Sequence, residues 1–205
     1  MEDLFIKQEH DRWFADKGDK TRLLQYKLDS ESIVFDCGGY RGQWSGEIFD
    51  LYGCNIHIFE PLVEYQSYIR QLLGKNQKIN INNFGVSSQN RSANIYLQED
   101  GSSEYLVQDQ GGDYEVVKLK RLSDLIDSNV DLVKMNIEGS EYEVIIDLIN
   151  TKKIQFIDNL LVQFHSENDG IEDATKIRAD IHDRLKMTHK LSWNYEFCWE
   201  SWERI

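Results

Sequence analysis

Short apolar runs alternate with amphipathic stretches along most of this chain, and that alternation limits the folds it can adopt. Apolar runs typical of buried strands lie at residues 33–35, 55–59, 79–83, 131–135 and 160–164. Stretches with helical spacing of apolar residues lie at about 43–52, 62–73, 141–149 and 172–187. Strands that alternate with helices form a mainly parallel sheet with helices on both faces. The sequence therefore predicts an α/β fold of the Rossmann-like, doubly wound type.

The two ends of the chain depart from this alternation. Residues 1–30 carry scattered apolar positions among charges, which favours short amphipathic helices. The last residues alternate as a hairpin, roughly 189–193 and 195–200, which would add antiparallel strands at one edge of the sheet. We therefore expect an N-terminal helical extension over residues 1–30 and one α/β domain over residues 31–205.

Acidic residues outnumber basic ones: 36 Asp and Glu against 23 Lys and Arg give a net charge of −13. A surface of this sign repels phosphate backbones and anionic lipid, so we expect neither nucleic acid nor membrane as a partner. No apolar run approaches the about 18 residues of a membrane span, and the start, MEDLFIKQEH, lacks a signal-peptide core. The 3 cysteines show no CxxC spacing, which indicates reduced thiols in the cytoplasm rather than a zinc site.

Polar groups and glycines follow the predicted strands at the points where the strands end. In an open parallel sheet, ligands bind beyond these carboxyl ends, near the switch in strand order. Each of these residues alone is typical of a loop or a helix cap, but together they favour a binding site. The set is Asp36-x-Gly38-Gly39-x-x-Gly42, Glu60, Asn83, Asn136-x-Glu138-Gly139 and His165.

The first two strand ends indicate an adenosine-containing ligand. The glycines at 38, 39 and 42 allow the backbone to approach a ligand at the start of a helix. Glu60 is placed at the end of the second strand to accept two ribose hydroxyls. Cys37 stands where a dinucleotide fingerprint would have glycine. The acidic surroundings (Asp36, Glu60, Glu138) suit a ligand with a sulfonium and an ammonium better than a pyrophosphate, which favours S-adenosylmethionine over a nicotinamide cofactor.

Five stretches carry a more specific resemblance: FDCGGYRGQWSGEI, IHIFEP, NFGVSS, VDLVKMNIEGSEYEVI and LLVQFHS. In their order and spacing, from about residue 32 to residue 166, they resemble the FkbM family of S-adenosylmethionine-dependent methyltransferases. Asn136 stands where the family usually has aspartate, and Gln163 where it usually has glutamate. Both changes keep hydrogen bonding and remove charge. A subgroup with both residues and a similar aromatic tail is linked to cell-surface or glycan sugars.

This resemblance implies an O-methyltransferase that moves a methyl group from S-adenosylmethionine to a sugar hydroxyl of a glycan or glycoconjugate. It places Asn136 beside the methionine part or the reacting centre. Asn83 would otherwise be a turn residue, and Phe84 an ordinary core aromatic. The implied cofactor residues are Asp36, Gly38, Gly39, Gly42, Glu60, Asn83, Phe84 and Asn136.

Transfer to a hydroxyl requires a group that takes its proton, and near neutral pH histidine suits this task. His165 alone among the five histidines follows a strand end on the expected ligand side. The alternative for His165 is a supporting role in which it hydrogen-bonds a carboxylate. Glu138 and Glu141 are the orienting groups or rival bases, although Glu141 could instead be a solvated carboxylate in the first turn of its helix. Lys134, between two apolar residues, is expected to pair with an acid.

A metal is not favoured. Asp36, Glu138, Glu141 and His165 have oxygen and imidazole groups suited to Mg²⁺ or Mn²⁺. However, no adjacent Asp-Asp pair occurs near the fifth predicted strand, and methylation of a sugar does not strictly need a Lewis acid.

The aromatic tail suggests how an acceptor would be held. Trp193, Tyr195, Phe197, Trp199 and Trp202 are expected to share one face of the closing hairpin, where rings could stack on sugars or simply form core. His189, at the start of the hairpin, is expected to contact the acceptor together with Trp193 and Glu141. Ser103 belongs to a polar stretch that would fold over the site or form a plain surface loop.

Two rival functions remain open. One is a nicotinamide-dependent oxidoreductase, which Cys37 and the lack of a Tyr-x-x-x-Lys pair disfavour. The other is a cofactor-binding module without turnover, for which Asn136 and Gln163 would be the evidence. The acidic surface favours a neutral glycan over a sugar phosphate. A free-standing enzyme and a domain of a larger glycosyltransferase-type polypeptide both fit this organisation.

Overall fold

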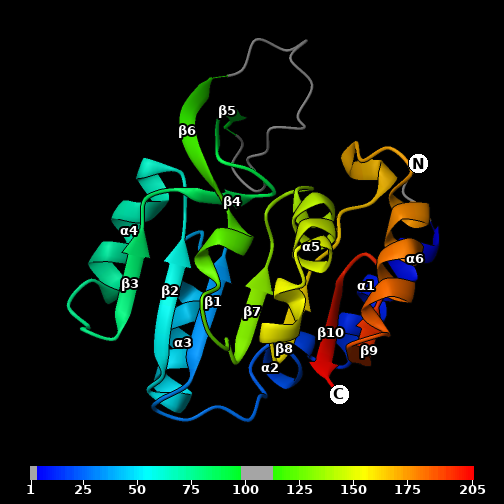
Figure 1. The fold of residues 1–205 in the computed structure, drawn as a ribbon, viewed down its shortest axis with the longest axis horizontal. Helices are drawn as coiled ribbons and strands as arrows, with labels where there is room; N and C mark the ends of the chain where they lie inside the picture. The colour runs from blue at the N-terminus through cyan, green and yellow to red at the C-terminus, as the bar shows by residue number, and fades with distance from the viewer. Residues whose placement is uncertain (1–3, 98–112) are drawn as a thin grey trace.

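A computed structural model describes residues 4–97 and 113–205 and is built around a seven-stranded sheet with the order β3-β2-β1-β7-β8-β10-β9 (Figure 1). The first five strands in this order are parallel, whereas β10 and β9 are antiparallel to their neighbours. The predicted mainly parallel sheet with an antiparallel hairpin is therefore confirmed. The strands are β1 (Ile33–Cys37), β2 (Asn55–Phe59), β3 (Ile79–Asn82), β7 (Leu132–Met135), β8 (Asn159–Val162), β9 (His189–Tyr195) and β10 (Trp199–Arg204).

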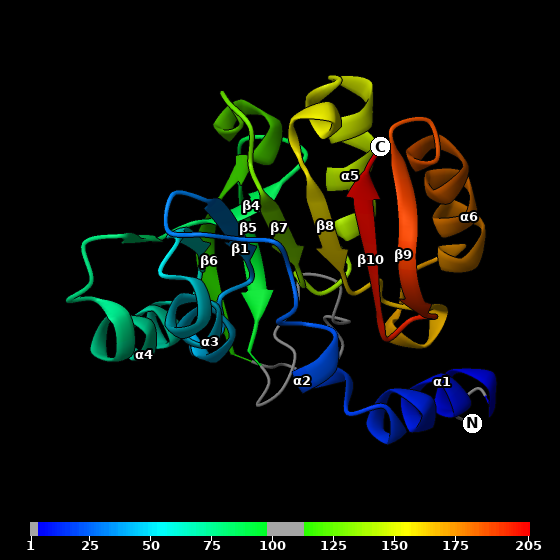
Figure 2. The ribbon, with the colours of Figure 1, turned by 90° about the horizontal axis from the view of Figure 1, so that it is seen from below.

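Helices cover both faces of this sheet, with α5 and α6 on one side and α3 and α4 on the other (Figure 2). A second, three-stranded sheet of order β4-β6-β5 comprises β4 (Gly85–Ser87), β5 (Arg91–Tyr96) and β6 (Tyr114–Arg121). The helices are α1 (Leu4–Ala15), α2 (Gly18–Thr21), α3 (Gln43–Tyr52), α4 (Val63–Leu73), α5 (Glu141–Asn150) and α6 (Ala174–Leu185), with 3-10 turns η2 (Leu122–Leu125), η3 (Lys153–Phe156) and η4 (Glu167–Asp169).

The central strands are apolar on both faces because both faces are buried. Side chains alternate along a strand, so Val34 packs toward α3 and α4 while Phe35 packs toward α5. In β7, Leu132 and Val133 divide between the same two cores. This double burial explains why the sequence shows continuous apolar runs there instead of an apolar–polar alternation.

The hairpin β9–β10 differs from the expectation in one respect. Trp193 and Tyr195 pack on the side of α1, whereas Trp202 lies in the core on the opposite side, with its ring centroid 4.8 Å from that of His182. The prediction that all five aromatic residues share one face is therefore wrong for Trp202, and also for Phe197, which lies in the turn and packs against the same core as Trp202. The reason is the two-residue period of a strand, which gives odd and even positions opposite faces.

The N-terminal segment packs directly on this hairpin and on α3. Trp13 of α1 is buried and makes ring contacts with Trp193 and Tyr195 at centroid distances of 6.0 and 5.1 Å. Farther along, the backbone oxygen of Leu23 accepts a hydrogen bond from the Trp44 indole at 3.1 Å. Helices are present within residues 1–30 as expected, while a domain boundary at residue 30 stays a prediction. Within the described ranges, no helix has the length and apolar character that a membrane crossing requires.

Candidate active site

The loops after β1, β2 and β7 meet at one end of the main sheet. The strand order of this sheet reverses there, between β1 and β7. The backbone N–H groups of Gly38 and Gly39 donate to the oxygen of Phe59 at the end of β2, at 3.0 and 3.3 Å. On the other side, the N–H of Asn136 donates to the oxygen of Cys37 at 3.0 Å. These bonds extend the strand pairing past the strand ends and hold the loops after β1, β2 and β7 together.

The glycines of the first loop occupy positions that other residues fit poorly. Gly38 has φ +84°, and a Cβ there would lie 1.9 Å from the backbone oxygen of Asn136. Gly42 also has φ +84° and precedes the first residue of α3. Left-handed backbone and close approach both favour glycine, which explains the spacing seen in the sequence.

A cavity of about 440 Å³ opens at this junction of loops. Five of the residues expected at the site line it: Gly38, Gly39, Glu60, Asn136 and Glu138. The other described residues lining it are mostly apolar or aromatic: Leu23, Tyr40, Gln43, Trp44, Pro61, Leu62, Tyr65, Lys134, Ile137 and Trp199.

Glu60 is a buried carboxyl held by backbone donors on both of its oxygens. Oε2 accepts from the N–H of Tyr40 and Oε1 from the N–H of Leu62, each at 2.9 Å. Burial raises the pKa of Glu60 to about 7, against the two backbone hydrogen bonds, which favour the charged form. Each oxygen keeps a further lone pair, so the carboxylate can accept from two neighbouring hydroxyls.

Asp36 supports the loop after β1 from beneath the cavity. Its fully buried carboxylate lies 2.9 Å from the Nζ of Lys134 and accepts from the Ser45 hydroxyl at 2.6 Å. Lys134 also donates to the backbone oxygen of Gly38 at 2.7 Å. The ion pair expected for Lys134 is confirmed, and it links Asp36 to the loop that contains the glycines.

Asn136 presents a polar atom that the described part of the protein leaves unsatisfied. Its Oδ1 is buried, has no hydrogen-bond partner there, and belongs to a residue that lines the cavity. A buried acceptor without a partner is unfavourable unless a ligand or water supplies a donor. An ammonium group would supply that donor, so the residues of this cavity fit a ligand with ribose hydroxyls at one end and an amino group at the other.

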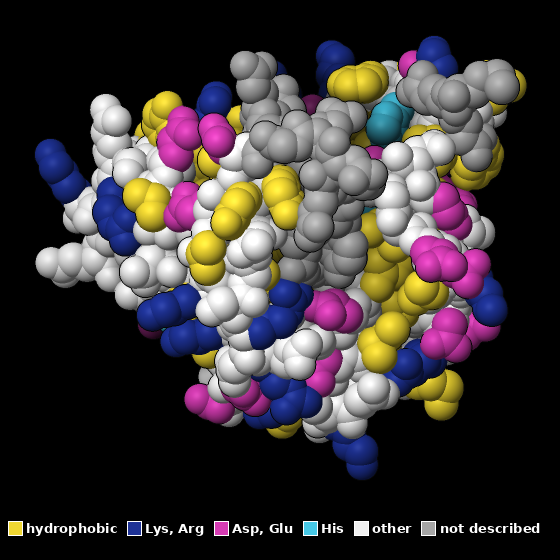
Figure 3. Space-filling view, turned by 90° about the horizontal axis from the view of Figure 1, so that it is seen from above, with side chains coloured by type: hydrophobic (Ala, Val, Ile, Leu, Met, Phe, Trp, Pro, Cys, Tyr) yellow, Lys and Arg dark blue, Asp and Glu magenta, His cyan; other side chains and the backbone are white. Residues whose placement is uncertain are grey.

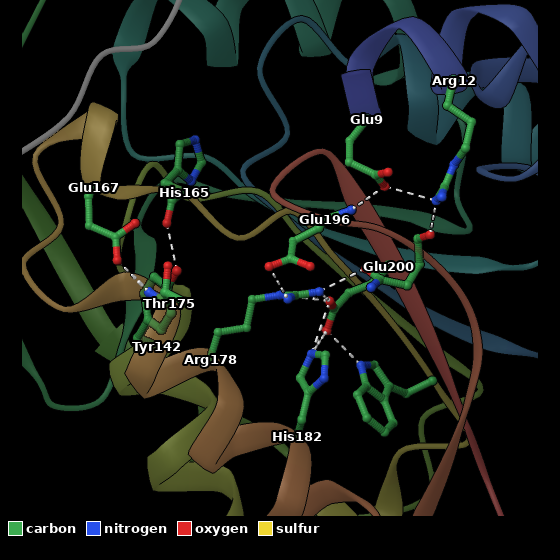
Figure 4. Close-up of polar contacts among 12 residues, drawn as sticks. Glu9, Arg12, Tyr142, His165, Glu167, Thr175, Arg178, His182, Glu196 and Glu200 are labelled. Atoms are coloured by element: carbon green, nitrogen blue, oxygen red, sulfur yellow. Dashed lines mark hydrogen bonds and ion pairs between the residues drawn. The ribbon is translucent and has the colours of Figure 1, made fainter. Parts of the chain in front are cut away.

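His165 lies between two carboxylates at the end of β8. Its Nε2 is 3.2 Å from Oε2 of Glu138, and its Nδ1 is 3.3 Å from the carboxylate of Glu141. Burial would lower the pKa of His165, but the charges and hydrogen bonds of Glu141 and Glu138 outweigh it and raise that pKa well above the ordinary value. The backbone oxygen of His165 accepts from the Tyr142 hydroxyl at 2.6 Å, which fixes the loop (Figure 4).

Glu141 is fully buried, so the alternative of a solvated carboxylate is wrong. It accepts from the N–H groups of Ile137 and Gly139 at 2.6 and 2.9 Å and thereby shapes the loop after β7. The neighbouring Glu138 has φ +56°, a left-handed backbone that is unusual for a residue with a Cβ. Such strained positions concentrate at functional sites.

Glu138 also lines a second cavity of about 370 Å³, so it lies at the boundary between the two. His165 lines the second cavity as well. The remaining described residues that line it are Ile6, His10, Gln163, Phe164, Ser166, Asn168, Asp169 and Phe197.

Residues 36–190 match the family described as the methyltransferase FkbM domain. The chain belongs to the FkbM methyltransferase family. This membership confirms the resemblance found in the sequence motifs. It also makes the protein a member of a methyltransferase family whose expected cofactor, S-adenosylmethionine, fits the residues of the first cavity.

Solved structures support the same fold for this FkbM-family protein. A methyltransferase FkbM from Methylobacillus flagellatus KT matches with a TM-score of 0.57 and 14% identity, over 91% of this chain and 46% of that one. This chain thus spans about half the length of the M. flagellatus chain.

Two other matches cover both chains almost fully. One is a Streptococcus mutans protein described as a methyltransferase, in complex with SAH (TM-score 0.55, 12% identity, 100% of both chains). The other is a Clostridium thermocellum protein described as an rRNA-methylase (0.56, 11%, 100% and 98%). The chain has no significant match among curated proteins.

Some residues expected at the site of this FkbM-family protein lie outside the first cavity. Asn83 is exposed between β3 and β4, and the Phe84 ring packs at 5.7 Å from that of Phe59, with the Nζ of Lys120 4.1 Å from its centroid. Neither Asn83 nor Phe84 lines the cavity. Their roles toward adenine stay predictions.

Three aromatic residues that were not predicted for the site line the cavity instead. Tyr40 and Tyr65 form an edge-to-face pair with centroids 4.6 Å apart. The signal for Tyr40 was its position directly after the glycine pair. Tyr65 and Trp44 lie within helices, and only the packing of α3 and α4 shows that they reach the cavity.

The structure does not bring the expected acceptor residues together. His189 is buried where β9 begins, and its Nε2 lies 2.9 Å from the backbone oxygen of Ile157. Because β9 starts opposite the end of β10, His189 lies at the edge of the sheet away from both cavities. Trp193 packs against Trp13 and lines neither cavity. Ser103 lies outside the described residues.

Over residues 4–97 and 113–205, no group of three or more His, Cys, Asp or Glu side chains is arranged to hold a metal ion. Asp36 pairs with Lys134, Glu138 and Glu141 pair with His165, and Glu141 also binds the backbone. Independence from a metal stays a prediction.

Proposed function

We propose that this protein transfers a methyl group from S-adenosylmethionine to a hydroxyl of a neutral sugar unit in a glycan or glycoconjugate. The observation that carries the proposal is the position of Glu138. It lies between the cavity that fits the cofactor and a second, polar cavity, and it contacts the one histidine that follows a strand end. Two adjoining cavities with an acid–base pair at their boundary suit group transfer between two bound molecules.

The first cavity supplies the groups that would hold S-adenosylmethionine. Glu60 would accept from the two ribose hydroxyls, and the Oδ1 of Asn136 would accept from the ammonium group. The aromatic wall of Tyr40 and Tyr65 would contact the adenine. When bound, the cofactor supplies a methyl group on a sulfonium, which is already electrophilic and needs no metal.

The chain's own chemical task is then to remove the hydroxyl proton. His165 would accept it at Nε2 in its neutral form, with the hydroxyl taking the place of the Glu138 carboxylate at that nitrogen, as the C–O bond forms and the C–S bond breaks. Glu138 and Glu141 would stabilise the imidazolium that results, because both carboxylates lie within 3.3 Å of its nitrogens. Glu141 acts as a positioning residue, since it also binds the backbone of the loop that carries Glu138.

Charge favours a neutral sugar over a nucleic acid as the acceptor. The chain carries a net charge of −13, and carboxylates of Glu138 and Asp169 line the second cavity. On the face where the parallel strands end, the visible Lys and Arg side chains of the described residues lie in separate groups with acidic ones between them (Figure 3). Among the described residues visible on this face, a polyanion would meet no continuous basic surface.

The test is cofactor conversion with a panel of neutral glycosides. We expect S-adenosylmethionine to be converted to S-adenosylhomocysteine, with a matching methyl mass added to one sugar, and expect titration calorimetry to show binding of S-adenosylhomocysteine but not NAD. Binding of the cofactor without conversion on any acceptor would favour the binding module. Methylation of RNA but of no glycoside would contradict the sugar assignment.

A further inference from the structure

The second cavity is assembled from parts of the chain that are far apart in sequence. Its volume of about 370 Å³ falls in the range of small-molecule pockets, about 300–1,000 Å³. Helix α1 contributes Ile6 and His10, the loop after β8 contributes Gln163, and the turn of the β9–β10 hairpin contributes Phe197. Only Glu138 is shared with the cofactor cavity.

The lining combines hydrogen-bonding groups with two phenyl rings. Amide, hydroxyl and carboxylate side chains come from Gln163, Ser166, Asn168 and Asp169. None of the described residues that line this cavity is Lys or Arg. The Ser166 hydroxyl already donates to Asp169 at 2.9 Å. A neutral polyhydroxylated ring matches this lining, because its hydroxyls can pair with the amides of Gln163 and Asn168 and its apolar face covers an aromatic ring. A phosphate would meet the carboxylates of Glu138 and Asp169, with no Lys or Arg among the described lining residues to balance its charge.

Phe197 occupies an unusual backbone conformation in the hairpin turn. Its φ of +54° is left-handed, and its ring is half-buried at the wall of the cavity. The turn is closed by the N–H of Cys198 donating to the oxygen of Tyr195 at 2.9 Å, and the N–H of Glu196 donates to Glu9 of α1 at 3.0 Å. The strained position is thus fixed by the turn and by α1.

Arg178 of α6 packs against the Phe197 ring on the side away from the cavity. Figure 4 shows the polar contacts of Arg178. Its guanidinium carbon lies 5.4 Å from the Phe197 centroid and 6.0 Å from that of Phe164, the other phenyl ring of the cavity. The guanidinium is itself fixed by buried Glu200, at 3.0 Å from Nε, and by Glu196 at 3.3 Å. Both rings are therefore presented by a rigid ionic network.

We propose that the second cavity is the acceptor site and that Phe197 is the specificity-determining ring against which the apolar face of the acceptor sugar stacks. This assignment rests on the proposed function, since it concerns the molecule that receives the methyl group. Helix α1 forms one wall of the site through Ile6 and His10, so the N-terminal segment takes part in acceptor binding.

The test compares Phe197→Ala with Phe156→Ala, a matched truncation on η3 of a ring that lines neither cavity. Removing a ring that stacks on the sugar should raise KM for a neutral glycoside by about 3- to 10-fold. We expect kcat to change little, the Kd for S-adenosylhomocysteine to stay at the parent value, and Phe197→Tyr to restore KM. Phe156→Ala should leave all of these values unchanged.

Saturation-transfer NMR with methyl glycosides of neutral hexoses provides a readout that does not need turnover. The parent should show strongest transfer to protons on one face of the sugar, and Phe197→Ala or Phe197→Leu should weaken the transfer to that face. If Phe197→Ala does not fold, Phe197→Leu serves in both assays. Enlarging the α1 wall with Ile6→Trp should weaken glycoside binding without weakening S-adenosylhomocysteine binding.

The outcomes separate the two proposals. If the parent methylates no glycoside, the proposed function fails, whatever the variants do. If the parent methylates a glycoside while Phe197→Ala keeps the parent KM and Ile6→Trp keeps parent binding, the acceptor lies elsewhere and only the assignment of the second cavity fails. Tighter binding of a sugar phosphate than of the neutral glycoside would also overturn that assignment.

Discussion

At the residue scale, Glu60 is a buried carboxyl that also lines the first cavity. Its carboxyl has a pKa of about 7 because burial disfavours the charge, yet both oxygens accept backbone hydrogen bonds that favour it. Small changes of pH near neutrality therefore change the form in which Glu60 meets a ligand. Only the carboxylate accepts from two hydroxyls at once.

Glu60→Gln should weaken the binding of S-adenosylhomocysteine by about 1–3 kcal/mol, the scale of a charge-assisted hydrogen bond. In the parent, affinity should fall as pH drops through about 7, since protonation removes an acceptor. The Gln variant should lose this pH dependence. Titration calorimetry across this range measures both effects, and an unchanged affinity would place the ribose elsewhere.

His165 shows how two carboxylates raise the pKa of an imidazole that we propose as the base. Its pKa is raised because Glu141 and Glu138 together outweigh the effect of burial, while His10 and Asp169 lie in the same cavity. The stability that the imidazolium contributes is fully present below the ordinary pKa of 6.5 and is lost as pH rises through the higher folded value. Activity should have the opposite trend, because in the proposed mechanism the neutral imidazole is the base.

The rate of the parent enzyme should therefore rise with pH, with a midpoint above 6.5. Glu138→Gln should move this midpoint downward, since one of the raising charges is lost. His165→Ala should lower kcat by about 10²–10⁴-fold with cofactor affinity retained. Profiles of kcat/KM against pH measure the midpoint, and a flat parent profile would reject His165 as the base.

At the scale of elements, helix α6 is joined to the hairpin by one buried carboxylate. Glu200 accepts from the Trp202 indole and lies near His182 Nε2, each at 2.8 Å, and it pairs with Arg178. Burial would raise the pKa of Glu200, but the hydrogen bonds and positive charges around it lower it below the ordinary value. This contribution to stability is present above the ordinary carboxyl pKa and is lost as pH falls through the lowered one.

Glu200→Ala should reduce the free energy of unfolding by about 3–5 kcal/mol, because Arg178 is then buried without its main partner. Glu203→Ala is the matched control on the same strand. Glu203 pairs with Lys190 at 3.0 Å on the surface, where such pairs contribute about 0–1 kcal/mol. Urea denaturation compares the two, and equal losses would contradict the assigned role of Glu200.

At the scale of the whole molecule, the N-terminal segment and the sheet share packed residues. Trp13 packs against the hairpin and is only 3% exposed. Leu23 lines the first cavity, and its backbone oxygen accepts a hydrogen bond from the indole of Trp44. Helix α1 also supplies a wall of the second cavity. We therefore expect the segment to unfold together with the sheet.

Trp13→Ala should reduce the free energy of unfolding by about 3–5 kcal/mol, as for a large core side chain. Phe14→Ala, the next residue on the same helix and 70% exposed, should change it by less than about 0.5 kcal/mol. Circular dichroism and tryptophan fluorescence should report one transition. Two separate transitions would instead support an independent extension over residues 1–30.

Local patterns in the sequence were enough to predict the sheet and several residues that line the first cavity. Most strands and helices of the sheet lie within a few residues of their predictions, as for the helix expected at 172–187 and found at Ala174–Leu185, whereas the last strand, expected at 195–200, lies at Trp199–Arg204. Gly38, Glu60 and Asn136 were predictable because they follow strand ends, and parallel strands end at the same edge. These signals are local: a period, a glycine spacing and a residue type.

The second cavity, which we propose as the acceptor site, depends on packing between distant segments. Phe197 lies in the hairpin turn and His10 in α1, so no sequence motif contains both of them. Only the packing of α1 on the hairpin brings the two residues to one cavity. His189 shows the converse, because the direction of β9 carries it to the far edge of the sheet. The left-handed backbone of Glu138 has no signal of its own either, since hydrogen bonds from neighbouring N–H groups to the buried Glu141 hold that loop in place.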